Sequence, residues 1–335
     1  MAQVSILMPI FNADRYLDIT LNSIERQSFD DFEVLLVDDG STDDSYAICK
    51  RWCSKDSRFK CRHQENAGGG VARNVALDWA LESDSEYIAW VDSDDLVSPR
   101  YLEVLIGAAK RYSCDIVQCR FFSFNDGNEC AIDFKPNYSE NRICVSSGLE
   151  FEKRLLIGGI DSAVLWNKLW KKSIYTDIRV SIRDGLSGRI NDDENILWKL
   201  YLHTDRVIDL PACLYGYRIR TDSVQHSKIN RRVLETFEIW GDRWRYYRSN
   251  SYHDLSRIAS EKILHVFALL LSKSIDEYED WSSFSEESKK CYLNCRYMTC
   301  DARRPDLLVL RFITKYWFGF FRIYGLLYRA LRSSN

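Results

Sequence analysis

Apolar, strand-like runs alternate with helix-like segments along the first 122 residues, and this alternation constrains the fold more than any other feature of the sequence. The runs are residues 4–11, 32–37, 59–63, 87–91 and 115–122. Between them, apolar residues recur at the spacing of an amphipathic helix. A chain of successive β-α units forms a mostly parallel sheet with helices on its faces. We therefore predict an α/β fold built on such a sheet.

The pattern changes in the rest of the chain. It is irregular over residues 123–145, and helical patterns return at Leu149–Ile157 and Ala163–Lys171. Another helix is predicted after the acidic run at residues 192–194, followed by two short strands at Val207–Leu210 and Leu214–Ile219. The C-terminal third is predicted to be wholly helical.

Two acidic clusters directly follow predicted strands, Asp38-Asp39-Gly40-Ser41 and Asp92-Ser93-Asp94. Parallel sheets of this kind bind ligands at the carboxyl ends of their strands. Two carboxylates two residues apart suit a hard divalent cation, which also binds substrate phosphates. A carboxylate at a strand end also suits a hydrogen bond from a base or a ribose hydroxyl. A solvated turn with helix-capping residues is the alternative interpretation of each cluster.

Three consecutive glycines, Gly68, Gly69 and Gly70, open a predicted helix that contains Arg73. Glycine lets the backbone approach a ligand closely, and a helix N-terminus favours a phosphate. An arginine in the first turns suits a bidentate phosphate contact. The segment is neither G-x-G-x-x-G nor a P-loop, so it supports neither NAD nor ATP binding. A flexible turn is the alternative interpretation.

Composition narrows the classes of function. A net charge of -3 over 335 residues gives no reason to expect nucleic acid as a partner. The 11 cysteines form no C-x-x-C pair, which argues against a zinc site and a secreted disulfide scaffold and favours buried, reduced thiols. The N-terminal apolar run is too short for a signal peptide, and no stretch has the length and apolarity of a membrane span. We therefore expect a cytoplasmic protein.

Four segments stand in the order and spacing of family 2 glycosyltransferases, which the chain resembles: VSILMPIFN (4–12), VDDGSTD (37–43), NAGGGVARN (66–74) and WVDSDD (90–95). Two later segments, VLWNKLWKKSIY (164–175) and LYGYRIRTDS (214–223), resemble the bacterial members that build capsule, O-antigen or other surface polysaccharide. The resemblance covers residues 3–225 and implies the GT-A fold. It implies a catalytic domain over 1–225, with a nucleotide-binding half (1–120) and an acceptor-binding half (121–225), followed by a helical region over 226–335.

The resemblance also implies a nucleotide-sugar site, with UDP as the nucleotide favoured by family habit. Phe11 is implied to stack on uracil, Asp39 to bind the base, and Asp94 to hold a divalent cation, Mn²⁺ or Mg²⁺. The residues implied to bind the nucleotide-sugar are Pro9, Phe11, Asn12, Asp39, Asn66, Gly69, Arg73, Asp92 and Ser93.

The catalytic base of the family is the Asp of a Glu-Asp pair at the start of a helix. The matching run here is Asn191-Asp192-Asp193-Glu194, and aligning the helix that follows puts Asp193 on the base. Asp192 is the alternative, because it replaces the glutamate of the family. An acidic first turn favoured by the helix dipole is the structural alternative. The implied reaction is one inverting displacement, in which Asp193 removes the acceptor proton and the cation stabilises the leaving diphosphate.

Contacts to the acceptor or the diphosphate, or a flap over the donor, are predicted for five further residues outside these motifs. They are Trp166, Asn167, Lys168, Arg218 and Arg220. Packing of the second half onto the sheet is the alternative.

Residues 306–331 are predicted to form one long helix. Arg311, Lys315, Arg322 and Arg329 lie on one stripe of this helix, beside a broad aromatic and aliphatic face. This arrangement suits an anionic membrane interface and fits a lipid-linked saccharide acceptor. We therefore expect a peripheral protein on the inner face of the cell membrane. Packing on the protein itself and a dimer interface are the alternatives.

Two other functions are alternatives. A catalytically inactive family member would serve as a scaffold in a polysaccharide assembly complex, but Asp94 and Asp193 are both present. A sugar nucleotidyltransferase would need a glycine-rich loop with an arginine after the first strand, where this chain has residues 9–12, PIFN. The sequence therefore predicts transfer of a sugar from a nucleotide-sugar to a saccharide acceptor in surface polysaccharide biosynthesis.

Overall fold

The computed structural model describes residues 2–129, 132–158, 163–179, 192–220, 234–277 and 281–304, with four single positions after them. The chain forms two compact units. One comprises Met1–Leu155 and Asp161–Ser223, and the other comprises Leu156–Ile160 and Val224–Asn335. The further division of residues 1–225 into a nucleotide-binding half and an acceptor-binding half stays a prediction.

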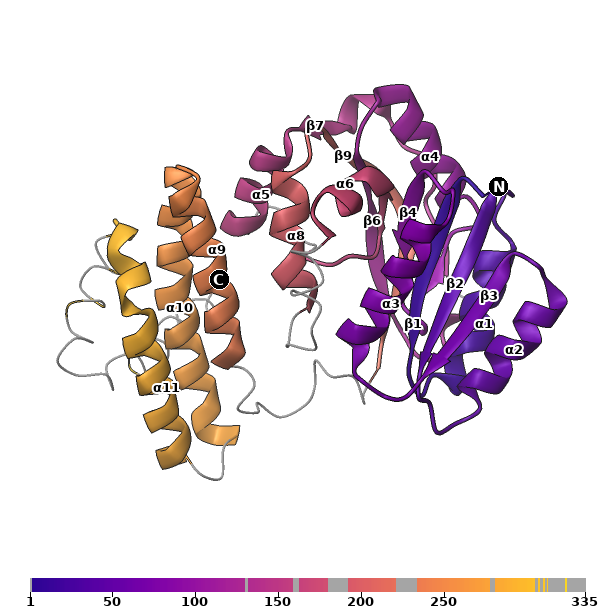
Figure 1. Ribbon diagram of the computed structural model, residues 1–335. Coiled ribbons are helices and arrows are strands. Elements are labelled where there is room, and N and C mark those ends of the chain that lie inside the picture. The colour runs from indigo at the N-terminus through magenta and orange to yellow at the C-terminus, as the bar shows by residue number, and fades with distance from the viewer. Residues whose placement is uncertain are drawn as a thin grey trace. The chain divides into compact units, whose positions relative to one another are not determined.

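The first unit is built on one sheet, to which the described residues contribute nine strands in the order β3-β2-β1-β4-β8-β6-β9-β5, with β7 beside β9 (Figure 1). Four parallel strands make up one side of it: β1 (Val4–Ile10), β2 (Phe32–Asp39), β3 (Phe59–Gln64) and β4 (Tyr87–Trp90). Every residue of β2 is buried, as expected for an apolar strand covered on both faces. The predicted α/β fold with a mostly parallel sheet is confirmed.

The remaining strands extend the sheet beyond β4. Strand β8 (Lys168–Lys171) is antiparallel to β4 and to β6 (Ile116–Asn125). Strand β9 (Val207–Ile219) is parallel to β6, and the short strands β5 (Leu96–Val97) and β7 (Cys144–Ser146) are antiparallel to β9. Because β5 directly follows the Asp92–Asp95 segment, β9 reaches the site from a distant part of the chain.

Helices cover the two faces of the sheet. The helices α1 (Asp14–Glu25), α2 (Ser45–Lys55) and α4 (Tyr101–Tyr112) share one apolar core with alternate residues of β1 and β2. Leu17 on α1 is fully buried there, and burial of such a side chain contributes about 2 kcal/mol. Helix α3 (Gly69–Glu82) contacts β1 and β2 from the other face (Figure 1). The strand order reverses beside β1, which is where sheets of this kind bind ligands.

Two sequence-based expectations are wrong. Residues 163–171 were expected to be helical, but they form an irregular segment and then β8. A short apolar run does not distinguish a buried strand from a buried helix, and here the pairing with β4 and β6 decides. The two strands expected at Val207–Leu210 and Leu214–Ile219 are one strand, β9. Its Pro211 lies where the register with β6 shifts, a position that tolerates a residue without an N–H.

Three helices complete the described part of the first unit. They are α5 (Gly148–Ile157), α6 (Lys172–Asp177) and α8 (Asp192–Leu202), with a short 3-10 turn at Glu140–Arg142. Helix α8 begins at the acidic run, as predicted. Its residues from Ile196 to Trp198 are buried, which anchors the acidic first turn to the body of the unit.

The second unit is helical where it is described. It contains α9 (Glu235–Ser249), α10 (His253–Glu277) and α11 (Trp281–Cys295), which lie side by side (Figure 1), and a 3-10 segment at Arg296–Asp301. None of the helices in the described ranges is long and apolar enough to cross a membrane. The basic and aromatic helix predicted over 306–331 lies outside the described residues, apart from single positions.

Candidate active site

The loops that follow β1 and β2 are joined through Asn12. Its side-chain Oδ1 accepts the backbone N–H of Thr42 at 2.8 Å, and its own N–H donates to the Ser41 hydroxyl at 3.0 Å. Asn12 has a φ of 49°, a left-handed conformation that asparagine tolerates. The ring of Phe11 beside it is 51% exposed and Pro9 is half-buried. Phe11 therefore offers an aromatic face at a strand end, and its stacking on a base stays a prediction.

Asp39, at the end of β2, fastens the glycine-rich loop. One carboxylate oxygen accepts the side-chain amide of Gln64 at 2.7 Å and the N–H of Ala67 at 3.0 Å, and the other accepts the N–H of Gly68 at 2.9 Å. The Asn66 amide returns a bond to the Asp39 carbonyl at 3.0 Å. Sequence reasoning missed this structural role. The base contact predicted for Asp39 stays a prediction, and it would share a carboxylate that already orders the loop.

The predicted acids converge around one arginine. Arg73 lies one turn after the start of α3 at Gly69, and its guanidinium is 3.6 Å from Asp92 Oδ1 and 3.8 Å from Asp193 Oδ1. The other oxygen of Asp193 accepts the N–H of Leu165 at 3.1 Å. Three segments that are far apart in the sequence thus meet at the carboxyl end of β4. The structure places the first residue of the candidate base pair, Asp192, at the start of α8 and does not describe its side chain.

Negative charge is concentrated at this point. Burial raises the pKa of Asp92 to about 7, against the effect of Arg73, and the carboxylates of Asp193 and Asp94 raise it further. The Asp92 side chain keeps 29% of its surface exposed, so water moderates this repulsion. The site therefore favours a cation or a hydrogen-bond donor that would relieve the repulsion between its acids.

Hydrogen bonds from residues of β9 hold the loop that carries the acids. The Tyr215 hydroxyl accepts the N–H of Asp92 at 3.2 Å and donates to Asp95 at 2.8 Å, while the N–H of Arg218 donates to the other oxygen of Asp95 at 2.8 Å. Burial and the charges of the neighbouring acids raise the pKa of Asp95 well above its ordinary value. Sequence reasoning gave Asp95 and Tyr215 no role. The sequence signal that pointed to Asp95 was its place as the fourth residue of the run from Asp92 to Asp95.

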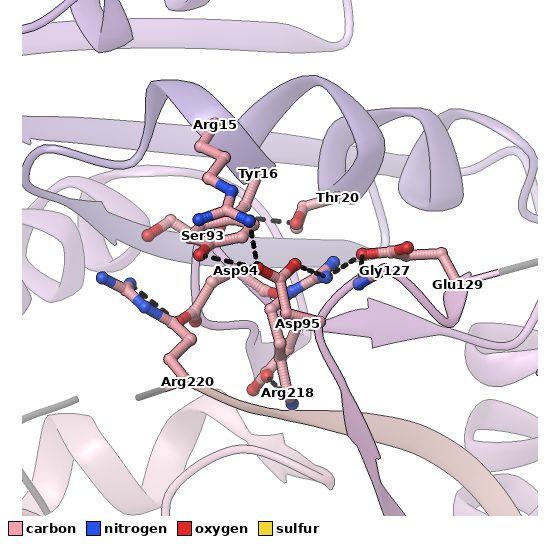
Figure 2. A network of polar contacts seen from close by, with 11 residues as sticks. Arg15, Tyr16, Thr20, Ser93, Asp94, Asp95, Gly127, Glu129, Arg218 and Arg220 are labelled. Carbon is pink, nitrogen blue, oxygen red and sulfur yellow. Dashed lines mark hydrogen bonds and ion pairs between the residues drawn. The ribbon is translucent and has the colours of Figure 1, made fainter. Parts of the chain in front are cut away.

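Asp94 itself meets a second arginine. Arg220 Nη1 is 3.1 Å from Asp94 Oδ2, and its guanidinium lies 4.9 Å from the centre of the Tyr16 ring (Figure 2). The neighbouring Ser93 carbonyl accepts the Thr20 hydroxyl at 3.1 Å, so α1 also contacts the loop. Arg220 is the residue, among those predicted for a flap, that reaches a predicted site carboxylate.

Known proteins resemble this chain in sequence and in fold. Residues 5–136 match the family model described as glycosyl transferase family 2. The chain is 31% identical over 247 residues to the cholesterol galactosyltransferase of Borreliella burgdorferi, a match that covers 70% of this chain and 67% of that protein. The chain belongs to glycosyl transferase family 2. The family resemblance seen in the sequence is therefore confirmed.

Other relatives of this family 2 member differ in length. The glycosyltransferase GlyA of Streptococcus pneumoniae is 30% identical over 248 residues, which cover 72% of this chain but only 32% of GlyA. The putative glycosyltransferase EpsH of Bacillus subtilis is 31% identical over 225 residues, with 66% and 62% covered. The chain thus spans about a third of GlyA and under two thirds of EpsH. The crystal structure of S. aureus TarS 1-349 in complex with UDP-GlcNAc is similar in fold, with a TM-score of 0.65, 18% identity and coverage of 98% and 92%.

The family implies a divalent cation, and the carboxylates near β4 provide part of the ligands that such an ion needs. Asp92 and Asp94 supply carboxylate oxygens, the ligands that Mg²⁺ and Mn²⁺ prefer. In the described part of the chain, however, no group of three or more ligating side chains is arranged to hold an ion. Mg²⁺ usually keeps several waters and binds through one or two carboxylates together with substrate phosphates. The residues therefore fit an ion that a bound diphosphate would also ligate.

Four of the five acceptor or flap residues predicted for this family 2 member are buried, namely Trp166, which is described below, and three polar or charged residues. Asn167, Lys168 and Arg218 are 1%, 0% and 2% exposed, so they have no surface to offer an acceptor. The Lys168 ammonium donates to the Val164 carbonyl at 2.6 Å and to Asn167 Oδ1 at 2.8 Å, which folds the segment before β8. Burial lowers the pKa of Lys168 to about 7. The described bonds of Asn167, Lys168 and Arg218 are therefore to other parts of the protein, and they order the segments around the site.

Trp166 lies in an aromatic stack. Its ring is stacked between Tyr215 and Tyr217, with centroid distances of 4.7 Å and 5.4 Å, and Phe121 meets it edge-on. Trp166 keeps 7% of its surface and Tyr217 is half-buried. The alternative of packing on the sheet thus accounts for Trp166, and Tyr217 is the member of the stack with a more accessible ring.

Proposed function

We propose that the chain is an active glycosyltransferase that moves a sugar from a nucleotide-sugar, UDP-linked, to a hydroxyl group of a saccharide acceptor. One observation carries the proposal: Asp92 and Asp193 both lie within 4 Å of the Arg73 guanidinium, beside Asp94, although the acids come from segments about a hundred residues apart. A cluster of acids around a cation at the carboxyl ends of parallel strands suits binding of a diphosphate and attack beside it.

Asp193 is the proposed base. Its Oδ2 is held by the Leu165 N–H, and its Oδ1 faces Arg73, so the carboxylate has a fixed direction. It removes the proton of the acceptor hydroxyl. The acceptor oxygen forms a bond to the anomeric carbon as the bond to the diphosphate breaks, and the electron pair leaves with the diphosphate. Attack opposite the leaving group inverts the anomeric centre.

The leaving diphosphate gains one negative charge when its bond to the sugar breaks, and Arg73 is positioned to stabilise its oxygens. We propose that Asp94 holds a divalent cation, Mn²⁺ or Mg²⁺, whose positive charge would stabilise the same oxygens when bound. Arg220 contacts Asp94 in the structure and is the residue that would exchange partners when the diphosphate arrives. Asp92, with its pKa raised by burial, is suited to a hydrogen bond with a ribose or sugar hydroxyl.

The donor side of the proposal rests on the loops after β1, β2 and β3. Phe11 and Asn12 follow β1, Asp39 ends β2 and Asn66 follows β3, and these four residues are proposed to bind the base and the ribose. Solved TarS structures of similar fold are titled as complexes with UDP and with UDP-GlcNAc, which supports UDP as the nucleotide. We further propose a lipid-linked saccharide acceptor in surface polysaccharide synthesis, with the basic segment 306–331 on the inner face of the membrane, from the sequence pattern alone.

A donor screen tests the proposal. Purified full-length protein would be mixed with Mn²⁺ or Mg²⁺ and a series of UDP-, GDP- and dTDP-sugars, and binding read by thermal shift. We expect one donor to raise the melting temperature, and Asp94→Ala to abolish the rise. A matched control is Asp133→Ala, an exposed acid outside the site that pairs with Lys135. A folded wild-type protein that responds to no donor would contradict the activity and favour a scaffold role.

A further inference from the structure

The guanidinium of Arg218 lies buried beneath the acidic loop. Its side chain has no exposed surface, and it is stacked between the rings of Tyr16 and Phe124, each 4.7 Å from the guanidinium carbon. A charge this deeply buried is stable only when it is paired, and its partners are therefore informative about its role.

The partners of Arg218 fall into two groups. Its Nε donates to the backbone carbonyl of Asp94 at 2.7 Å. Its Nη1 contacts Asp126, at 3.1 Å, and Glu129, both in the loop after β6 (Figure 2). Partial burial works against ionisation of Glu129, but the hydrogen bond and charge of Arg218, together with hydrogen bonds from backbone N–H groups, outweigh it and lower the pKa of this carboxyl. The guanidinium thus joins an anchored acidic loop to the backbone of Asp94.

The rest of the acidic loop is held by atoms of the same strand. The N–H of Arg218 and the hydroxyl of Tyr215 both donate to Asp95, and Tyr215 also accepts the N–H of Asp92. Asp94 is the loop residue whose backbone carbonyl is fixed by a side-chain cation. The backbone position of a residue limits where its side chain can point, so a bond to this carbonyl bears on the direction of the Asp94 carboxylate.

We propose that Arg218 is a positioning residue for Asp94, acting through the backbone carbonyl and touching neither donor nor acceptor; this inference rests on the function proposed above. Asp126 and Glu129 hold one side of the guanidinium, and the planar group is wide enough to contact these acids and the Asp94 carbonyl at the same time. A lysine would keep the charge but present a single nitrogen, so it would lose this bridge.

The test compares the binding of UDP, with and without Mn²⁺, to wild type and Arg218→Lys by titration calorimetry. We expect affinity for UDP in Mn²⁺ to fall about tenfold, as loss of a charge-assisted hydrogen bond implies, and affinity without Mn²⁺ to change less than about twofold. A role in folding alone would lower the melting temperature and leave the Mn²⁺-dependent part of the affinity unchanged. That result would overturn the proposal.

Two further variants make the test decisive. Arg15→Lys is the matched control, because Arg15 pairs with the same Asp126 at 2.5 Å but is 71% exposed, and we expect binding within about twofold of wild type. If Arg218→Lys does not fold, Glu129→Gln decides: it weakens the anchor and is expected to reduce Mn²⁺-dependent binding about threefold. No reduction in a folded Glu129→Gln would then reject the role of Arg218. If wild type itself binds no UDP in Mn²⁺, the proposed donor site fails, which is a distinguishable outcome.

Discussion

The loops after β1, β2 and β3 and the loop after β4 are stabilised in different ways. The first set is joined by bonds between neighbouring loops, as between Asn12 and Thr42, 30 residues apart. The Asp92–Asp95 loop depends on β9, and its bond from Tyr215 to Asp95 spans 120 residues. The first set also presents exposed groups such as Phe11, whereas the second rests on buried charges such as Arg218. The comparison teaches that loops proposed to recognise the donor and loops proposed to place the reactive acids are held by different kinds of contact, the first by local hydrogen bonds and the second by a distant strand.

The largest effect is expected at the acid cluster. Asp193→Asn keeps the shape of the side chain and removes the proposed base, so we expect kcat to fall about 10³-fold, close to 4 kcal/mol of barrier. Asp192→Asn is the matched control and is expected to stay within about tenfold of wild type. Release of nucleoside diphosphate, measured with the donor found in the screen, reports both. A larger loss in Asp192→Asn would assign the base to that residue.

Replacing a glycine tests the loops after β1, β2 and β3. Gly40 has a φ of +70°, and a Cβ built on it would lie 2.6 Å from the backbone nitrogen of Asn66. Gly40→Ala is therefore expected to lower the free energy of unfolding by about 2–3 kcal/mol. Gly107→Ala is the control, because nothing lies within 4 Å of its Cβ position and the glycine is inside α4. It should stabilise the protein by about 0.5–1 kcal/mol in urea unfolding. Equal effects of the two variants would show that the loop tolerates strain.

Removing one hydroxyl tests the hold of β9 on the acids. Tyr215→Phe leaves the buried carboxylate of Asp95 without one donor and the N–H of Asp92 without an acceptor. We expect a loss of about 2 kcal/mol in the free energy of unfolding. Tyr217→Phe is matched to it, because both rings stack on Trp166, and it should cost under about 0.5 kcal/mol. Similar losses in both would indicate that ring packing, not the hydroxyl, fixes the loop.

The last effect concerns the pH dependence of stability, and it is the smallest when it is expressed per pH unit. Burial lowers the pKa of Lys168 from 10.5 to about 7. Between these two pH values the unfolded chain binds a proton that the folded chain does not. The free energy of unfolding therefore increases as the pH rises from about 7 toward 10.5. Compared with Lys168→Met, the free energy of unfolding of the wild type should increase by about 1 kcal/mol per pH unit between pH 7 and 10, as measured by urea unfolding at each pH. A difference that is independent of pH would mean that Lys168 stays charged when folded.

The same contrast decides what the sequence could predict. Strands β1 to β4 and the helices between them follow from apolar periodicity, because each is a complete local pattern flanked by turn residues. The predicted acids Asp92, Asp94 and Asp193 and the predicted Arg73 do lie together. The motifs place the first two after β4 and the other two in the first turns of α8 and α3. Their individual roles stay predictions.

What the sequence could not predict depends on distant partners. The segment 163–171 has an apolar pattern that fits a helix equally well, and only its pairing with β4 and β6 makes part of it a strand. Arg218 and Lys168 were predicted to contact the acceptor or the diphosphate, or to form a flap over the donor, although their charges are buried. Their burial depends on acids, carbonyls and rings contributed by other elements, among them Asp126 and Val164. No local pattern carries that information.

The continuity of β9 has a consequence for how the chain tolerates insertions. The strand runs unbroken from Val207 to Ile219, and it delivers Tyr215 and Arg218 to the acids by their distance along the strand. A slip of one residue would bring Leu214 or Gly216 to the place of the tyrosine, and neither carries a hydroxyl. The number of residues in β9 therefore determines which side chains reach the acidic loop. A single residue added before Tyr215 would move Tyr215 and Arg218 out of register with Asp95, and the loop would lose both hydrogen bonds.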